Sequence, residues 1–159
     1  MTFINRNRRK PLRPEAAMIR LEELCARSEQ CVSELRRKLA GWQIEPDDAD
    51  AIIRSLKTRR YVDDARYAAA FVRDKYRFAR WGRRKIHMAL RQKRIAEDLI
   101  DEALGNIDEQ EYAEILGHIL KAKARTLDMD VYEDRMKLFR FALARGFEPD
   151  LIKKLMPGR

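Results

Sequence analysis

Residues 61–104 read YVDDARYAAAFVRDKYRFARWGRRKIHMALRQKRIAEDLIDEAL, and this stretch decides the fold. Its apolar residues recur three and four positions apart, which is typical of amphipathic helices. We expect three short helices here, the first of them stopping near Trp81 and Gly82. The expected inward positions, helix by helix, are Ala68, Phe71 and Val72; Ile86, Ala89 and Leu90; and Leu99, Ile100, Ala103 and Leu104.

The same three-helix pattern recurs on both sides of this stretch. Three turns share one local order, in which an apolar residue is followed by a helix start: residues 44–47, 95–98 and 147–150. The apolar pairs Leu35 and Leu39, Ile86 and Leu90, and Leu138 and Ala142 recur about fifty residues apart. This period indicates a tandem repeat, and units this small must share cores with their neighbours. The sequence therefore predicts an all-α fold, an elongated, curved array of three tandem three-helix repeats.

The expected boundaries follow from these turns. We assign the repeats to residues 14–60, 61–106 and 107–159, after a disordered basic arm at residues 1–13 that contains Arg6, Arg8, Arg9 and Lys10. Ser28, Asp108 and Asp130 each precede an apolar helical pattern and are expected to cap helices, since short polar side chains accept from free backbone N–H groups.

Charge and composition limit the possible functions. The 159 residues carry a formal net charge of +9, and residues 73–94 hold ten basic side chains against the single acid Asp74. Such a positive cluster favours a polyanion or an acidic protein surface as partner. Cys25 and Cys31 form no disulfide framework or zinc motif, and neither a signal peptide nor a membrane span is recognisable. We expect a cytoplasmic protein without membrane contact.

Several spaced motifs resemble the RecX family over residues 15–156. They are Ser28-Glu29 with residues 34–39 (ELRRKL), residues 61–68 (YVDDARYA) with Phe71-Val72, Trp81-Gly82 with Lys85-Ile86 and Ala89-Leu90, and residues 141–147 (FALARGF). RecX proteins are bacterial regulators of the RecA recombinase built of three three-helix repeats. The resemblance implies a protein that docks along the RecA–DNA filament and inhibits ATP hydrolysis and strand exchange. One departure is Lys93-Arg94-Ile95, where the family usually has glycine in place of Arg94, a residue that favours a left-handed helix end.

The predicted contact residues are the basic side chains off the apolar stripes, together with one aromatic. Arg84, Arg91 and Arg94 are spaced seven and three apart, so we expect them to share a helical face that reaches an anionic groove. Trp81 is a candidate for stacking on a base or an arginine, although a buried position is the commoner role of such a tryptophan. The full predicted RecA- and DNA-binding set is Arg36, Arg37, Arg59, Arg60, Arg80, Arg83, Arg84, Lys85, Arg91, Lys93 and Arg94, with Trp81 for stacking.

No catalytic or metal-binding pattern is recognisable, so we expect neither an enzyme nor a cofactor. His87 and His118 stand isolated in the sequence, and the aspartates near residues 47–50 and 63–64 suit helix starts. Residues 95–120 contain eight acids and no Lys or Arg, which is typical of a solvated acidic face.

Three functional hypotheses remain open. The first is a monomeric RecX-like regulator whose partners are the RecA filament and DNA, both single- and double-stranded, without sequence specificity. The second is a stand-alone nucleic-acid-binding protein of the helix-turn-helix type, although no helix carries the pattern expected for base readout. The third is a helical-repeat adaptor whose charge is incidental.

Overall fold

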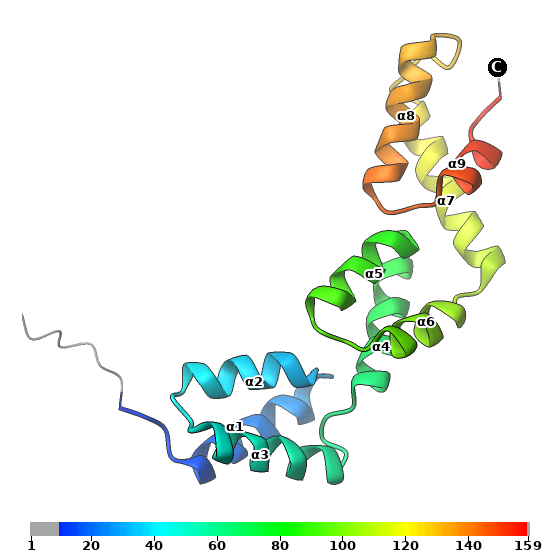
Figure 1. Ribbon diagram of the computed structural model, residues 1–159. Coiled ribbons are helices and arrows are strands. Elements are labelled where there is room, and N and C mark those ends of the chain that lie inside the picture. Colours follow the sequence, from blue (N-terminus) through cyan, green and yellow to red (C-terminus); the bar gives the residue numbers. More distant parts are fainter. Residues whose placement is uncertain (1–9, 159) are drawn as a thin grey trace, which may run out of the picture. The chain divides into compact units, whose positions relative to one another are not determined.

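The computed structural model describes residues 10–158, which form nine α-helices and no strand (Figure 1). The helices are α1 (Pro14–Arg27), α2 (Val32–Gly41), α3 (Pro46–Thr58), α4 (Asp64–Arg77), α5 (Arg83–Gln92), α6 (Glu97–Gly105), α7 (Glu109–Ala124), α8 (Tyr132–Ala144) and α9 (Pro149–Leu155). The all-α prediction is confirmed. The elongation and curvature of the array stay predictions, and most of the predicted disordered arm, residues 1–9, lies outside the described residues.

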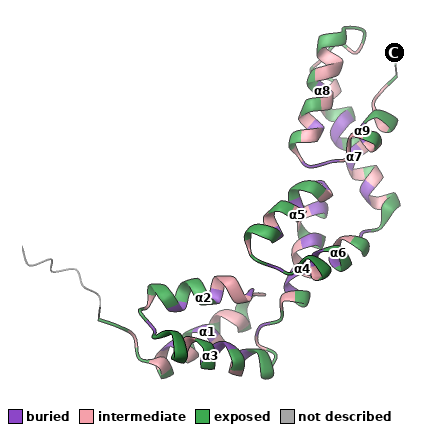
Figure 2. Cartoon of the chain, in the orientation of Figure 1, coloured by how far each residue is buried: buried purple, intermediate pink, exposed green. Residues whose placement is uncertain are grey.

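The first compact unit ends at Asp64 and contains α1, α2 and α3. Its helices form because leucine and isoleucine recur at helical spacing, and these side chains meet in one core. Figure 2 marks the buried residues along the three helices. Leu21, Leu35, Leu39 and Leu56 are fully buried there. Asp64 also stabilises this unit, since its Oδ1 accepts from the backbone N–H of Val32 at the start of α2, at 2.9 Å.

The second compact unit begins at Ala65 and contains α4 to α9. Ile86, Leu90 and Ile100 are fully buried in its first group of three helices, α4 to α6. Tyr112 and Phe147 are fully buried in the second group, α7 to α9, where their ring centroids lie 5.2 Å apart.

The second helix of each three-helix group ends in the same turn. After α2, α5 and α8, the backbone N–H of an apolar residue donates to a carbonyl five residues earlier: Ile44 to Leu39, Ile95 to Leu90, and Phe147 to Ala142. This is the Schellman arrangement, which requires a left-handed residue just before the apolar one. Gln43, Arg94 and Gly146 have positive φ angles at that position. The replacement of glycine by Arg94 therefore leaves the turn intact, and α5 keeps the same ten-residue length as α2.

Two of the three predicted caps are wrong. Ser28 follows the end of α1, and α2 begins at Val32 with Cys31 before it, because the distant Asp64 carboxylate supplies the acceptor. Asp130 lies one residue too early, since Val131 precedes α8 and has no side-chain cap.

The structure also tests the third predicted cap, Asp108, and the predicted end of the helix α4. The prediction for Asp108 is confirmed, because its carboxylate accepts from the backbone N–H of Glu111 at 2.8 Å. Helix α4 ends at Arg77, earlier than the expected stop near Trp81.

Candidate functional site

Helix α5 carries the densest group of basic side chains. Its fully buried positions are Ile86 and Leu90, which lie four residues apart and point into the core. The other sides of a helix with so narrow an apolar stripe face water. Arg84, Lys85 and Arg91 are exposed on this helix, so the structure places three predicted site residues on one accessible element.

The predicted alignment of Arg84, Arg91 and Arg94 holds only in part. Arg84 and Arg91 lie on α5, whereas α5 ends at Gln92 and Arg94 occupies the following turn with φ of 57°. Helical spacing therefore does not relate Arg94 to the other two. Arg91 also donates from Nε to Oε1 of Glu97. Arg84 and Arg91 thus share the exposed face of α5, whereas Arg94 lies beyond the end of the helix.

The predicted site residues of the first unit are all exposed: Arg36, Arg37, Arg59 and Arg60. Arg36 pairs with Asp50 of α3 at 2.7 Å, and Arg59 pairs with Glu22 of α1 at 3.0 Å. Exposed ion pairs contribute roughly 0–1 kcal/mol, so both arginines can exchange these partners for the anionic group of a ligand.

Arg83 has surroundings unlike those of an exposed basic face. Its side chain is only 22% exposed, and its guanidinium lies 4.0 Å from the centroid of the Tyr112 ring. It donates to Glu109 at 2.6 Å and to Glu148 at 3.4 Å. Its backbone N–H donates to the Tyr112 hydroxyl at 3.0 Å, and that hydroxyl donates to Glu148 at 2.9 Å. Arg83 thus connects the start of α5 to α7 and to the residue before α9.

Backbone contacts at the same place bring α5 against the end of α8. The N–H of Gly82 donates to the carbonyl of Arg145 at 2.7 Å, and the N–H of Arg84 donates to that of Gly146 at 3.0 Å. A Cβ added to Gly82 would lie under 3.0 Å from backbone atoms of Gly146, so the two backbone segments are in direct contact. We call this group, made of Gly82, Arg83, Tyr112, Gly146 and Glu148, the α5–α8 joint.

Tyr112 is fully buried at the centre of the α5–α8 joint. Burial raises the pKa of its hydroxyl far above the ordinary value, although the nearby Arg83 opposes this shift. The hydroxyl therefore stays protonated at neutral pH and serves as a hydrogen-bond donor to Glu148.

Trp81 lies among aromatic and basic side chains and is partly buried. The ammonium groups of Lys75 and Lys85 lie 4.6 and 4.5 Å from its ring centroid, and the Phe71 ring meets it edge-on at 6.3 Å. Cations over an indole ring are attracted by its π electrons. A base that stacks on Trp81 would have to compete with these lysines for the ring.

Phe78 is a surface residue that sequence reasoning missed. It follows α4 and is 80% exposed, between Arg77 and the predicted site residue Arg80. Arg80, in turn, is exposed and has a positive φ of 56°. The sequence did contain a signal for this exposed residue. Phe78 is an aromatic residue in the basic stretch that lies beyond the last inward-facing position of α4.

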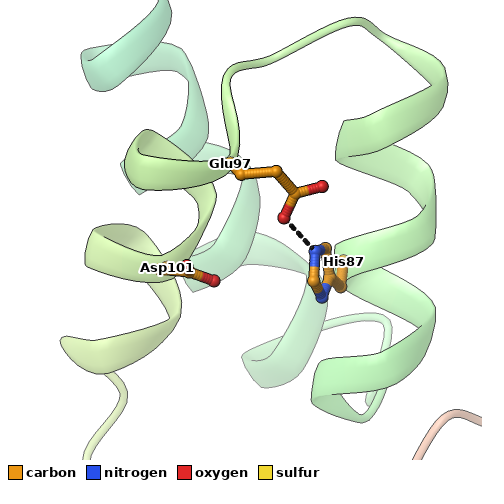
Figure 3. Close-up of side chains that lie close together, drawn as sticks. All are labelled: His87, Glu97 and Asp101. Carbon is orange, nitrogen blue, oxygen red and sulfur yellow. Dashed lines mark hydrogen bonds and ion pairs between the residues drawn. The ribbon is translucent and has the colours of Figure 1, made fainter.

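A second cluster missed by sequence reasoning joins α5 to α6. His87, which stands isolated in the sequence, lies against Glu97 and Asp101 in the structure (Figure 3). Its Nε2 lies 2.8 Å from Oε2 of Glu97. The pKa of Glu97 is lowered, first by this hydrogen bond with His87 and then by the one from Arg91. One ring nitrogen and two carboxylates are donor groups that can hold a metal ion. Lys93, another predicted site residue, is the partly buried residue that directly follows α5.

Comparison with known proteins identifies the class of this helical-repeat chain. The model of the RecX second three-helix domain matches residues 63–104, and that of the third three-helix domain matches residues 108–156. A protein named Regulatory protein RecX from Clostridium botulinum (strain Eklund 17B / Type B) is 32% identical over 96% of this chain and 74% of its own length. The chain belongs to the RecX family of regulatory proteins.

A second relative agrees with this assignment, and a solved structure agrees with the fold. The Regulatory protein RecX of Clostridium perfringens (strain 13 / Type A) is 35% identical over 77% of this chain, which spans only 58% of that protein. A crystal structure of RecX from Lactobacillus salivarius has a TM-score of 0.81 at 21% identity, over 89% of this chain and 93% of that chain. This likeness supports the fold. Between residues 10 and 158, none of the helices is both long and apolar enough to traverse a bilayer.

Proposed function

We propose that this protein regulates the RecA recombinase, mainly as an inhibitor, by binding in the groove of the RecA–DNA filament. Bound there, it bridges RecA protomers and obstructs the movements coupled to ATP hydrolysis and strand exchange, and so limits DNA repair and the SOS response. Membership of the RecX family is the observation that carries this proposal. The regulator acts as a cytoplasmic monomer and needs neither catalytic residues nor a cofactor.

The exposed arginines outside the α5–α8 joint are the proposed contacts. Arg37, Arg80, Arg84 and Arg94 are exposed, and no ion pair engages them within residues 10–158. Guanidinium groups bind both phosphates and carboxylates in a bidentate manner, so they suit DNA as well as acidic protein surfaces. Arg83 is left out of this set, because its side chain is held by Tyr112, Glu109 and Glu148.

The direct test measures the DNA-dependent ATPase of the cognate RecA while the full chain is titrated in. We expect the rate to fall as the regulator approaches the concentration of filament binding sites. The variant Arg84→Glu with Arg94→Glu should inhibit at least about tenfold less well, which corresponds to a loss of about 1.4 kcal/mol. Lys121→Glu reverses an exposed positive charge on α7, away from the proposed contacts, and should inhibit normally. An unchanged ATPase over a broad range of stoichiometry would contradict the proposal.

The ten basic residues in positions 73–94 support a second candidate, a nucleic-acid-binding protein that acts without RecA. Non-specific binding depends on phosphate contacts and weakens steeply as salt rises. A gel-shift series with unrelated duplexes and single strands, from low salt to about 0.2 M salt, separates the candidates. Selective retention of one operator sequence at the higher salt would favour the second candidate, whereas uniform, salt-sensitive binding is expected for the RecA regulator.

A further inference from the structure

The cluster of His87, Glu97 and Asp101 has the composition of a metal site. His87 comes from α5, while Glu97 is the first residue of α6 and Asp101 lies one turn later on the same helix. One ring nitrogen and one oxygen from each carboxylate lie within 4.8 Å of one another (Figure 3). In the described part of the chain, this is the one group of at least three such residues close enough to share an ion.

The donor atoms favour a transition metal over calcium or magnesium. Calcium and magnesium take oxygen ligands, whereas an imidazole nitrogen beside carboxylates suits zinc and its neighbours in the first transition row. Ligands about 2.1 Å from a tetrahedral zinc ion lie about 3.4 Å apart. The His87–Glu97 separation of 2.8 Å must therefore widen to admit the ion. All three side chains are at least partly exposed, which leaves them room to change rotamer.

The acidic residues of α6 also favour a cation. Glu97 and Asp101 are four residues apart on one helix face, where two like charges repel each other. Asp98 and Glu102 add two more acids to α6. Within residues 10–158, the side chain of Asp101 makes no hydrogen bond or ion pair, so one carboxylate of the cluster is unmatched. An ion between the helices would neutralise this excess.

Arg91 does not block the cluster, although it binds the same carboxylate. Its Nε donates to Oε1 of Glu97, whereas His87 meets Oε2. An ion held by Oε2 leaves Oε1 free to keep its arginine, and such a hydrogen bond fixes the orientation of a ligating carboxylate. Arg91 therefore supports the cluster. It can keep its bond to Oε1 of Glu97 when an ion replaces the hydrogen bond between His87 and Oε2.

We propose that His87, Glu97 and Asp101 form a binding site for one divalent transition-metal ion, with Zn²⁺ as the ion that best fits the donor atoms. Its three protein ligands come from α5 and α6, and its remaining coordination position faces solvent, where water or a group from a binding partner completes it. The site joins α5 and α6 by a link that does not depend on the proposed function in RecA regulation.

Isothermal titration calorimetry of the full chain with ZnCl₂, in a buffer that does not bind metals, tests the site. Cys25→Ser serves as the background, because thiols bind zinc and the Cys25 thiol is only half-buried. We expect one ion per chain and a loss of affinity of about tenfold or more in both His87→Gln and Asp101→Asn. His118→Gln is the matched control and should bind as the background does.

Two outcomes would overturn the proposal. One is the absence of saturable binding by Zn²⁺ to the background chain. The other is an unchanged affinity in His87→Gln and Asp101→Asn, which would place the ion elsewhere and leave the cluster as an ion pair only. Circular dichroism of each variant shows whether it is folded, and the absorption spectrum of bound Co²⁺ distinguishes nitrogen and oxygen ligands from a thiolate. RecA ATPase is measured separately, so failure of the metal site leaves the regulatory function untouched.

Discussion

At the scale of single residues, Gly82 and Gly146 determine how closely α5 can approach the end of α8. Gly82 has no room for a side chain, and Gly146 has a φ of 95°, a conformation that side-chain-bearing residues rarely adopt. A Cβ on Gly146 would also meet backbone and Cβ atoms of Lys85 at under 3.0 Å. Both positions are therefore expected to tolerate glycine alone.

We expect Gly82→Ala to lower the free energy of unfolding by about 1–3 kcal/mol, because the added methyl group overlaps backbone atoms that cannot rotate away. Urea unfolding followed by circular dichroism measures the change. Gly117→Ala is the matched control: nothing lies within 4 Å of its added Cβ, and it sits inside α7. Since alanine favours a helix more than glycine does, that control should gain about 0.5–1 kcal/mol. Equal effects at both positions would contradict the proposed close contact.

Tyr112→Phe removes the hydroxyl that accepts from Arg83 and donates to Glu148. We expect a loss of about 1–3 kcal/mol at neutral pH, since a partly buried N–H and a carboxylate lose their partner. Tyr132→Phe, at a tyrosine that is 71% exposed, should leave the stability unchanged.

The raised pKa of Tyr112 adds a pH dependence to this comparison. The folded chain holds the proton to higher pH than the unfolded chain does, so the neutral hydroxyl stabilises the fold fully below about pH 10. That stabilisation is lost as the pH rises further. The stability difference between the natural chain and Tyr112→Phe should therefore narrow above about pH 10. A difference that stays constant from neutral to alkaline pH would show that Tyr112 has an ordinary pKa.

At the scale of elements, the repeated turn after α2, α5 and α8 allows a direct comparison of its left-handed residue. Gly146 fills this position after α8, whereas Arg94 fills it after α5 with φ of 57°. We expect Arg94→Gly to raise the free energy of unfolding by about 1 kcal/mol, because an L-residue with a Cβ is strained there. Arg94→Ala removes the charge but retains the Cβ, so it should not show the gain. Chemical denaturation of both variants checks this, and an equal gain in both would assign the effect to charge.

The core positions of the helices were predictable because helical spacing is a local property of the sequence. Leu35, Leu39, Ile86 and Leu90, selected from their repeat positions, are fully buried in the structure. The start of α2 was not predictable in the same way. The acceptor for the backbone N–H of Val32 is the carboxylate of Asp64, which lies 32 positions away. The residues next to Val32 therefore do not indicate where the helix begins.

The candidate site was predicted less completely for a related reason. A run of basic residues identifies a charged segment, but their partners depend on packing between helices distant in sequence. Arg83 is held by Tyr112 and Glu148, which lie 29 and 65 positions further along the chain. His87 and Asp101 likewise approach each other only because α5 and α6 pack together. Charge and spacing therefore predicted which residues are exposed better than they predicted which residues form contacts with other helices.

At the scale of the whole molecule, the α5–α8 joint and the Arg77–Glu111 pair connect the two three-helix groups of the second unit. Arg77 donates to both carboxylate oxygens of Glu111, at 2.8 and 3.2 Å. With these contacts, α4 to α9 form one compact unit, separate from the first unit that ends at Asp64. Units that share such contacts are expected to open cooperatively.

Hydrogen exchange measured by mass spectrometry tests this cooperativity. In the Gly82→Ala variant, we expect amides of α4 to α6 and of α7 to α9 to lose protection together, because the altered contact belongs to both groups. Peptides from α1 to α3 should exchange as in the natural chain. Loss of protection confined to α4–α6 would show that the two groups open independently.

The engaged state of Arg83 affects how a mutational scan of the basic stretch should be interpreted. Alanine at Arg84 removes an exposed charge, whereas alanine at Arg83 also withdraws the guanidinium from a buried tyrosine and two glutamates. A loss of activity in Arg83→Ala would look like lost ligand binding, although its cause would be a destabilised fold. Strains carrying Arg83 substitutions therefore need their protein abundance quantified before any phenotype is attributed to binding.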